Sequence, residues 1–235
     1  MKLDLCPSPA LYQYYKSDND TVIVVDVFRA SATMCTMLNN GASAIIPVSN
    51  SELAKEYKSK GYLVGAERKT KRCEFADFGN SPLDYTPEKV SGREIVFTTT
   101  NGTRAIDVAC DCKELFVGSF PNIDAVAERC LQRAERVVIL CAGWNNRINI
   151  EDSLFGGAFA ENLLKNASVK FDSDAIRMTY ELWLRVKNNL EEYLKLSDHY
   201  QRLIDNSAVS DASYCITPNS ISFVPTYNKT DKKIY

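Results

Sequence analysis

The chain reads Thr21-Val22-Ile23-Val24-Val25-Asp26-Val27-Phe28-Arg29-Ala30-Ser31, and this short stretch gives the clearest indication of its fold. Residues 21–27 form a continuous apolar, largely β-branched run, which is typical of a strand buried on both faces. Residues 30–39 then favour a helix, and Gly41 follows where a helix commonly ends. A buried strand followed at once by a helix is the repeating unit of α/β proteins.

The same alternation continues along the chain. Further strands are predicted at residues 44–48, 62–64, 94–98, 115–117 and 136–141, and helices at 51–60, 103–109, 122–133 and 151–165. The alternation predicts an α/β fold, with a parallel or mixed sheet covered by helices. Residues 67–87 show little periodicity, and a loop of that length in a compact domain is usually functional.

The last part of the chain has a different pattern. Residues 172–196 predict one long helix that packs on the body of the protein, and residues 198–204 predict a short one. Residues 220–225 read as an edge strand before a charged tail. We therefore expect a single α/β domain over residues 1–235, in which residues 170–235 are mainly helical.

Composition narrows the classes of partner. The chain of 235 residues has 28 Lys and Arg against 30 Asp and Glu, a net charge of −2, so no general nucleic-acid binding is expected. No apolar run approaches the ~18 residues of a membrane span, so no membrane partner is expected either. The chain does not open like a signal peptide, and several of its eight cysteines, Cys141 among them, lie in apolar runs. We expect a cytoplasmic protein with free thiols.

In open α/β sheets, ligands bind beyond the carboxyl ends of the strands. Asp26, Arg29 and Ser31 follow the first buried strand. Asp26 alone could simply cap a helix. The three together are better explained by a metal ion and a phosphate group, because a buried Asp needs a partner and a helix start favours anions.

Two further strand ends carry polar residues. Thr98, Thr99, Asn101 and Gly102 follow the strand at 94–98 and could cradle an oxyanion, although Asn-Gly is also an ordinary turn. Glu151 and Asp152 open a later helix, where carboxylates also suit the helix dipole. Asp26, Glu67, Glu151 and Asp152 together offer hard oxygen ligands that suit Mg²⁺ better than zinc, and the chain holds one histidine, His199.

Six motifs together resemble the 2-phosphosulfolactate phosphatase family. They are Val24-Val25-Asp26-Val27-Phe28-Arg29-Ala30-Ser31-Ala32-Thr33, Gly65-Ala66-Glu67-Arg68, Gly79-Asn80-Ser81-Pro82, Thr98-Thr99-Thr100-Asn101-Gly102-Thr103, Cys141-Ala142-Gly143 and Glu151-Asp152, in this order. Asp211 and Cys215 extend the match toward the end of the chain. The chain departs from the family pattern at Trp144-Asn145-Asn146, in a loop expected to face the part of the substrate that is not phosphate.

The resemblance implies a three-layer α/β/α fold, a homodimer, and Mg²⁺-dependent hydrolysis of (R)-2-phospho-3-sulfolactate, a step in coenzyme M biosynthesis. Mg²⁺ would be held by Asp26 with help from Glu151 or Asp152, and Asp26 could instead be a covalent nucleophile. Arg29 would bridge phosphate oxygens, with Asn101 beside it. The other substrate contacts would come from Ser31, Asn80, Ser81, Thr98, Thr99 and Gly102, with Arg68 and Arg147 for the sulfonate or carboxylate. His199 would be a general acid or merely structural.

Two alternatives stay open. One is a phosphatase for another small hydroxyacid or sugar phosphate. The other is a non-catalytic protein that binds a phosphorylated metabolite, which would need the Arg and Thr donors but not the cluster of acids.

Overall fold

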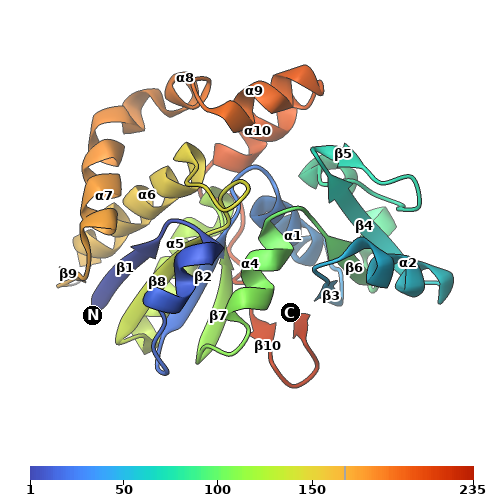
Figure 1. Cartoon of the computed structure of the whole chain (residues 1–235), viewed down its shortest axis with the longest axis horizontal. Helices are drawn as coiled ribbons and strands as arrows, with labels where there is room; N and C mark the ends of the chain where they lie inside the picture. Colours follow the sequence, from blue (N-terminus) through green and yellow to red (C-terminus); the bar gives the residue numbers. More distant parts are fainter. Residues whose placement is uncertain (167) are drawn as a thin grey trace.

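The computed structural model describes residues 1–166 and 168–235 and shows an α/β protein with two sheets (Figure 1). The strands of the first sheet all run parallel, in the order β7-β2-β8-β1-β9. They are β1 (Lys2–Cys6), β2 (Thr21–Val25), β7 (Glu114–Gly118), β8 (Arg136–Cys141) and β9 (Lys170–Phe171). Because they are parallel, their carboxyl ends share one edge of the sheet.

The second sheet is mixed, in the order β10-β11-β3-β6-β4-β5. Its strands are β3 (Ala44–Pro47), β4 (Leu63–Arg68), β5 (Lys71–Arg72), β6 (Glu94–Thr98), β10 (Tyr227–Asn228) and β11 (Lys233–Ile234). The central strands β3, β6 and β4 are parallel, β11 and β5 pair antiparallel with β3 and β4, and β10 pairs antiparallel with β11.

Helices cover both sheets. They are α1 (Ala30–Asn39), α2 (Ser51–Ser59), α3 (Pro87–Val90), α4 (Gly102–Ala109), α5 (Ile123–Arg133), α6 (Ile150–Asn166), α7 (Asp174–Val186), α8 (Leu190–Leu194), α9 (Asp198–Asp205) and α10 (Val209–Ile216). In Figure 1, α6 and α7 lie on one side of the first sheet, while α1 and α4 lie between that sheet and the second.

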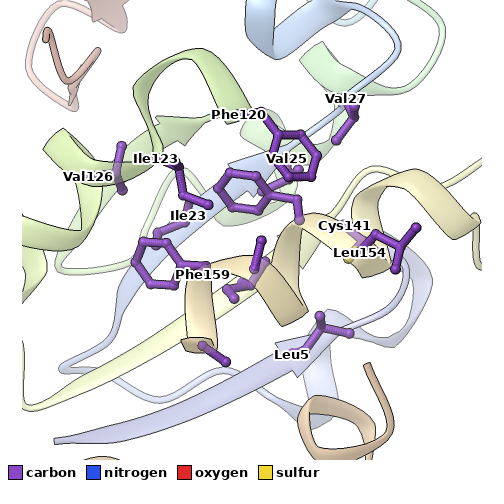
Figure 2. Close-up of a cluster of buried hydrophobic side chains, with 14 of the residues drawn as sticks. Leu5, Ile23, Val25, Val27, Phe120, Ile123, Val126, Cys141, Leu154 and Phe159 are labelled. Atoms are coloured by element: carbon purple, nitrogen blue, oxygen red, sulfur yellow. The ribbon is translucent and has the colours of Figure 1, made fainter. Parts of the chain in front are cut away.

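The side chains of β2 explain this layering, because successive residues of a strand point to opposite faces. Ile23 and Val25 join the apolar cluster that α5 and α6 cover, where Phe159 also lies (Figure 2). Val22 and Val24 join a second cluster, which contains residues of α1, of α4 and of the second sheet. The first sheet is thus the middle layer of an α/β/α arrangement, as the sequence predicted.

The alternation of strands and helices is confirmed along most of the chain, but β1 was not predicted. It pairs with β8 and β9 inside the first sheet. Its sequence, Lys2–Cys6, is short and interrupted by Asp4. That carboxylate is buried in an ion pair with Arg136, which lets a charged residue occupy a buried strand.

Three predicted segments differ in the structure. The helix predicted at 172–196 breaks between α7 and α8 into a 3₁₀ turn that contains the poor helix formers Asn188 and Asn189. The predicted strand at 220–225 is not one, because Pro225 has no N–H to donate and only Thr226 bridges to β7. The predicted loop at 67–87 begins inside β4, so Glu67 and Arg68 stand at a strand end.

In the described part of the chain, no helix combines the length and the apolar character that crossing a membrane requires.

Candidate active site

A narrow pocket lies at the carboxyl ends of β2, β4 and β6. Five residues predicted from the sequence line it: Asp26, Arg29, Glu67, Asn80 and Asn101. Phe28, Thr70, Trp144 and His199 complete the wall. Its free room is about 10 Å³, which is enough for about one water molecule. The strand-end rule therefore brings the main candidates of the sequence to one place.

Asp26 follows the last residue of β2 and is buried. Its own N–H donates to Ser31 Oγ at 2.8 Å, and the Ser31 N–H donates to the Asp26 carbonyl at 3.0 Å. Ser31 is fully buried and lies outside the pocket wall, so it holds the Asp26 backbone rather than facing a ligand.

Burial raises the pKa of Asp26 to about 6. The nearby imidazole of His199 opposes this shift, whereas the charges of Glu67 and Glu151 add to it. A carboxylate that is costly to ionise gains most from a cation placed against it. The pocket is thus electrostatically suited to a positive ligand beside Asp26.

Arg29 is the N-cap residue of α1 and is paired with Asp211, a buried residue of α10. Ser81 donates to the other oxygen of Asp211 at 2.7 Å, and Arg29 Nη2 donates to the Thr70 carbonyl at 3.3 Å. Ser81 therefore supports the guanidinium through Asp211. Asp211 is not among the site residues that the sequence predicts, because it lies 182 residues from Arg29 and follows no strand.

Glu67 joins two loops of the site. One of its oxygens accepts the Thr70 N–H at 2.5 Å, and the other accepts the Thr100 N–H at 3.3 Å. Lys69 and Thr70 have φ values of 52° and 67°, a left-handed turn that the Glu67 contact stabilises. Because its oxygens already have partners, Glu67 organises the pocket wall more than it offers a vacant ligand position.

The residues after β6 serve different purposes. Thr99 and Thr103 bond each other at the start of α4, with Thr103 N–H donating to Thr99 Oγ at 3.3 Å. Thr98 accepts a bond from Arg68 Nη2 at 2.8 Å. Thr98, Thr99 and Arg68 thus lie outside the pocket wall, while Asn101, the N-cap residue of α4, lines it.

Glu151 and Asp152 at the start of α6 are fully buried and have separate environments. Asp152 accepts the Val27 N–H at 2.8 Å and the Gly143 N–H at 3.1 Å, so it ties together the chain beyond β2 and β8. Its burial raises its pKa well above the usual range, and the charges of Asp26 and Glu151 raise it further. Both of its oxygens are occupied by backbone donors.

Glu151 holds His199. Its Oε1 lies 2.8 Å from His199 Nδ1, and Asn149 Nδ2 donates to the same oxygen at 3.1 Å. The second oxygen, Oε2, is buried without a partner among the described residues. His199 is itself buried, packs edge-on against Phe28 at 5.8 Å between ring centroids, and lines the pocket.

Arg147 lies away from the main pocket. It is exposed at the end of a tight turn with Trp144, and it lines a neighbouring cavity that shares Trp144 and His199 with the first. Cys141 is fully buried at the end of β8, and burial raises the pKa of its thiol well above the usual range, so it is a core residue. The eight cysteines are all unpaired.

Gly102 is needed where α1 and α4 approach each other. A Cβ added there would lie 2.6 Å from Ala30 Cβ and 2.9 Å from Asp26 Oδ2. We expect Gly102→Ala to displace the Asp26 carboxylate and to lower kcat roughly 100-fold, since displacements of about 1 Å have such effects. Steady-state kinetics checks this.

Gly61→Ala provides the control for that prediction. Gly61 has a φ of +88° and no neighbour within 4 Å of an added Cβ, so alanine would strain the backbone far from the site. It should lower the melting temperature and leave kcat unchanged. If Gly102→Ala, like Gly61→Ala, lowered the melting temperature but left kcat unchanged, the close contact with Asp26 would be irrelevant to activity.

The chain was compared with known proteins. A family model described as 2-phosphosulpholactate phosphatase matches residues 6–230. A probable 2-phosphosulfolactate phosphatase of Caldanaerobacter subterraneus subsp. tengcongensis is 36% identical over 225 residues, 91% of this chain and 92% of that protein. Proteins with the same name from Thermotoga petrophila and Clostridium acetobutylicum are 39% and 33% identical, over 88% and 97% of both chains. The chain therefore belongs to the 2-phosphosulfolactate phosphatase family.

Proposed function

We propose that this protein is a Mg²⁺-dependent phosphatase that hydrolyses (R)-2-phospho-3-sulfolactate to 3-sulfolactate and phosphate. One structural observation supports this proposal beyond family membership. The same buried pocket contains the cationic side chain of Arg29, the amide of Asn101 and the carboxylates of Asp26 and Glu67. A phosphomonoester needs its charge neutralised and a nucleophile positioned, and these groups supply both.

Phosphate recognition would involve Arg29 and Asn101. They are the N-cap residues of α1 and α4, and neither cap residue's side chain accepts a hydrogen bond from its helix. The Ser31 and Thr103 N–H groups at these helix starts already donate to Asp26 and Thr99, so phosphate recognition would rest on the Arg29 guanidinium and the Asn101 amide themselves. Asp211 holds the Arg29 guanidinium in place from behind, which limits the reorganisation that binding requires.

Mg²⁺ fits the donors that the pocket offers. Asp26, which lines the pocket, would hold it together with Glu151, which lines the neighbouring cavity and whose Oε2 is buried without a partner among the described residues. In the described residues no three His, Cys, Asp or Glu side chains could hold a metal ion by themselves. Mg²⁺ commonly uses only one or two carboxylates and completes its shell with water and substrate phosphate. When bound, it would neutralise phosphate charge and lower the pKa of a coordinated water.

His199 is proposed to donate a proton to the leaving oxygen. Its Nδ1 is fixed by Glu151 at 2.8 Å, and its ring lines the pocket beside Asp26. A carboxylate bonded to one imidazole nitrogen orients the ring and directs the other nitrogen toward the reacting group. The lone histidine of the sequence thus has a defined place in the proposed reaction.

The proposal predicts complete dependence on the metal ion. Purified protein should release inorganic phosphate from phosphosulfolactate in the presence of Mg²⁺, and the release should stop with EDTA and resume when excess Mg²⁺ is added. Undiminished release after extensive chelation would contradict the metal assignment. Circular dichroism with and without EDTA serves as the control for loss of structure.

The same assay separates the alternatives. A phosphatase for another hydroxyacid or sugar phosphate would show a higher kcat/KM for that ester than for phosphosulfolactate. A non-catalytic binding protein would give a calorimetric binding signal and no phosphate release.

A further inference from the structure

A second cavity adjoins the proposed phosphate pocket. Trp144 and His199 line both, so they form the common wall between them. The second cavity has about 220 Å³ of free room against about 10 Å³ in the first. The narrow pocket cannot enclose a whole substrate, and the neighbouring cavity beyond Trp144 and His199 has the room for the part that is not phosphate.

Unpartnered polar atoms collect around these two cavities. In the described residues, five buried side-chain nitrogen or oxygen atoms lack a hydrogen-bond partner. Three belong to residues lining the second cavity, Asn149 Oδ1, Glu151 Oε2 and Arg202 Nε, and a fourth, Asn80 Oδ1, belongs to the first. Buried polar groups are nearly always paired. Arg202 Nε is a donor and is the atom of this set that an anionic ligand can satisfy, whereas the three oxygens accept hydrogen bonds and need a donor or a cation.

Arg202 of α9 is the main cationic group of the second cavity. Its guanidinium carbon lies 4.0 Å from the centroid of the Trp144 ring, a cation–π contact that holds the guanidinium over this ring. It forms no ion pair with any described residue. A planar, unpaired guanidinium is the side chain best suited to bind a carboxylate or sulfonate with two parallel hydrogen bonds.

The surface under Arg202 is rigid. Trp144 and Arg147 exchange both backbone hydrogen bonds, at 3.0 and 2.9 Å, around Asn145 and Asn146. These two residues have φ values of 50° and 62°, which asparagine tolerates better than most residues. Ser8 Oγ donates to the Asn146 carbonyl at 2.9 Å and anchors the turn.

The acids in the second cavity do not neutralise Arg202. Glu151 binds His199 and Asn149 through Oε1, and neither Glu151 nor Asp198, which is exposed in the first turn of α9, forms an ion pair with Arg202. Exposed Arg147 adds a second cation to the wall, also without an ion pair among the described residues. The cavity thus presents one guanidinium that lies over Trp144 and one that is exposed to solvent.

We propose that this cavity binds the acidic group of the substrate that lies remote from the phosphate, with Arg202 as the residue that determines specificity for an acid-bearing ester. This inference rests on the proposed function, because it places the phosphate in the neighbouring pocket. The ligand class is a phosphate monoester of a hydroxyacid, whose carboxylate or sulfonate pairs with Arg202.

Substitution of Arg202 tests the inference with three esters. Arg202→Met should lower kcat/KM for phosphosulfolactate at least tenfold, mainly through KM, since hydrogen bonds to charged groups contribute effects of that order. It should change kcat/KM for glycerol 2-phosphate, which carries no acid group, less than twofold. An equal loss for 2-phospholactate would identify the carboxylate as the bound group, and an unchanged value there would identify the sulfonate.

Two variants serve as comparisons. Arg177→Met removes a guanidinium that also lies over an aromatic ring, 5.7 Å from the Phe171 centroid but away from both cavities, and should leave all three esters unaffected. Arg202→Lys keeps the charge but loses the planar fork, so it should recover only part of the loss. Equal effects of Arg202→Met on esters with and without an acid group, or no effect on either, would overturn the inference.

A calorimetric titration separates this inference from the phosphatase proposal. The probe is 3-sulfolactate, whose binding requires no turnover. If the unsubstituted protein hydrolyses no ester yet binds 3-sulfolactate, and Arg202→Met weakens that binding at least tenfold, the cavity is supported and the phosphatase proposal fails. If the protein hydrolyses phosphosulfolactate and Arg202→Met binds 3-sulfolactate as tightly as the unsubstituted protein, the cavity assignment fails alone.

Discussion

Asp26→Asn is expected to reduce kcat for phosphosulfolactate at least 1,000-fold without unfolding the protein. The carboxylate lies in the pocket with Arg29 and Asn101 and is the first candidate for holding Mg²⁺. Loss of a charged group that supports a metal ion removes several kcal/mol of transition-state stabilisation, and about 4 kcal/mol corresponds to a factor of 1,000. Phosphate release under saturating substrate measures the effect.

The same substitution should not destabilise the metal-free protein at pH 7. The pKa of Asp26 is raised in the folded state, from 3.8 to about 6, so the folded state binds the proton more tightly than the unfolded chain does. The stabilising effect of that proton is present below about pH 4 and is lost as the pH rises through 6. At pH 7 the ionised side chain therefore destabilises the fold, and an uncharged amide relieves the cost.

Urea unfolding in EDTA tests this reasoning. Asp26→Asn should be as stable as the unsubstituted protein or more stable at pH 7, and the gain should shrink as the pH falls from 6 toward 4, because wild-type Asp26 then becomes protonated. Asp107→Asn, the same change at an exposed residue of α4, should affect neither activity nor stability. A stable Asp26→Asn protein with full activity would remove Asp26 from the mechanism.

The sequence predicted the parts of the fold in which local pattern and tertiary environment agree. The continuous apolar runs of β2 and β8 belong to strands buried on both faces, and both were predicted. The strand β1 was missed because Asp4 breaks its pattern, and the partners that make this residue acceptable in a buried strand include Arg136 and Ser173, 132 and 169 residues away. A sequence pattern that covers a few neighbouring residues cannot reveal a partner so far along the chain.

In the candidate site, too, some residues could be predicted from the local sequence and others depend on tertiary packing. Asp26, Arg29 and Asn101 follow strands directly, and parallel strands place such residues at one edge, so their meeting could be predicted. Asp211 and Arg202 lie on α10 and α9, which reach the site only through tertiary packing, and no spacing in the sequence links them to the strand ends. Thr99, predicted as a ligand contact, accepts the Thr103 N–H at the helix start and does not line the pocket, so its contact with a ligand stays a prediction.

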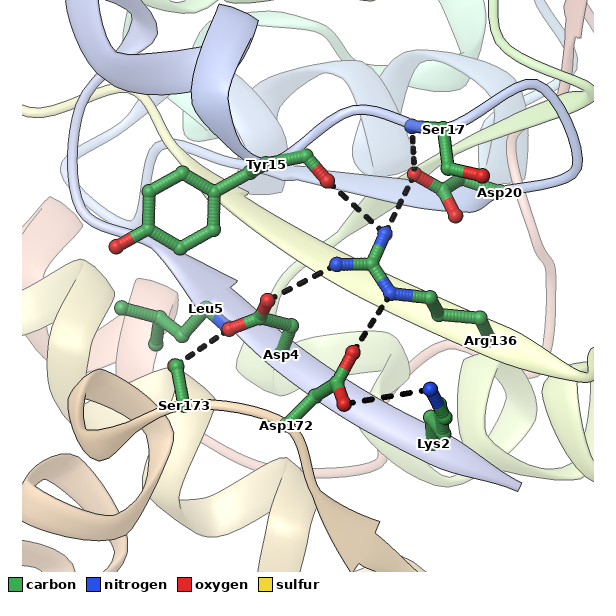
Figure 3. Close-up of polar contacts among 9 residues, drawn as sticks. All are labelled: Lys2, Asp4, Leu5, Tyr15, Ser17, Asp20, Arg136, Asp172 and Ser173. Atoms are coloured by element: carbon green, nitrogen blue, oxygen red, sulfur yellow. Dashed lines mark hydrogen bonds and ion pairs between the residues drawn. The ribbon is translucent and has the colours of Figure 1, made fainter.

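Arg136→Met is expected to cost about 3–5 kcal/mol of unfolding free energy, the largest effect on stability that we predict. Arg136 opens β8 and pairs with three carboxylates, at 3.0 Å from Asp4, 2.8 Å from Asp20 and 3.1 Å from Asp172 (Figure 3). It also donates to the Tyr15 carbonyl at 2.9 Å. Methionine would retain much of the packing but remove the only cation that contacts all three acids.

The burial of the acids explains why the loss is large. The side chains of Asp4 and Asp20 are only 6% and 1% exposed, so they would keep like charges close together with little water to screen them. These residues belong to β1 and to the segment before β2, and Asp172 follows β9. The same guanidinium therefore connects strands that are distant in the sequence, and its removal weakens several strand contacts at once.

Arg133→Met is the matched control, because Arg133 forms a single exposed contact, 3.7 Å from Glu114, and its loss should change stability by less than about 0.5 kcal/mol.

The bond from Arg136 lowers the pKa of Asp172, so stability from this pair is present above the unfolded pKa and is lost as the pH falls through the folded value. The difference in unfolding free energy between Arg136→Met and the unsubstituted protein, measured by urea unfolding, should therefore become smaller below about pH 4. A difference no larger than that of Arg133→Met at pH 7 would show that the three carboxylates do not need this cation, and that β1 is held in the sheet by its apolar contacts alone.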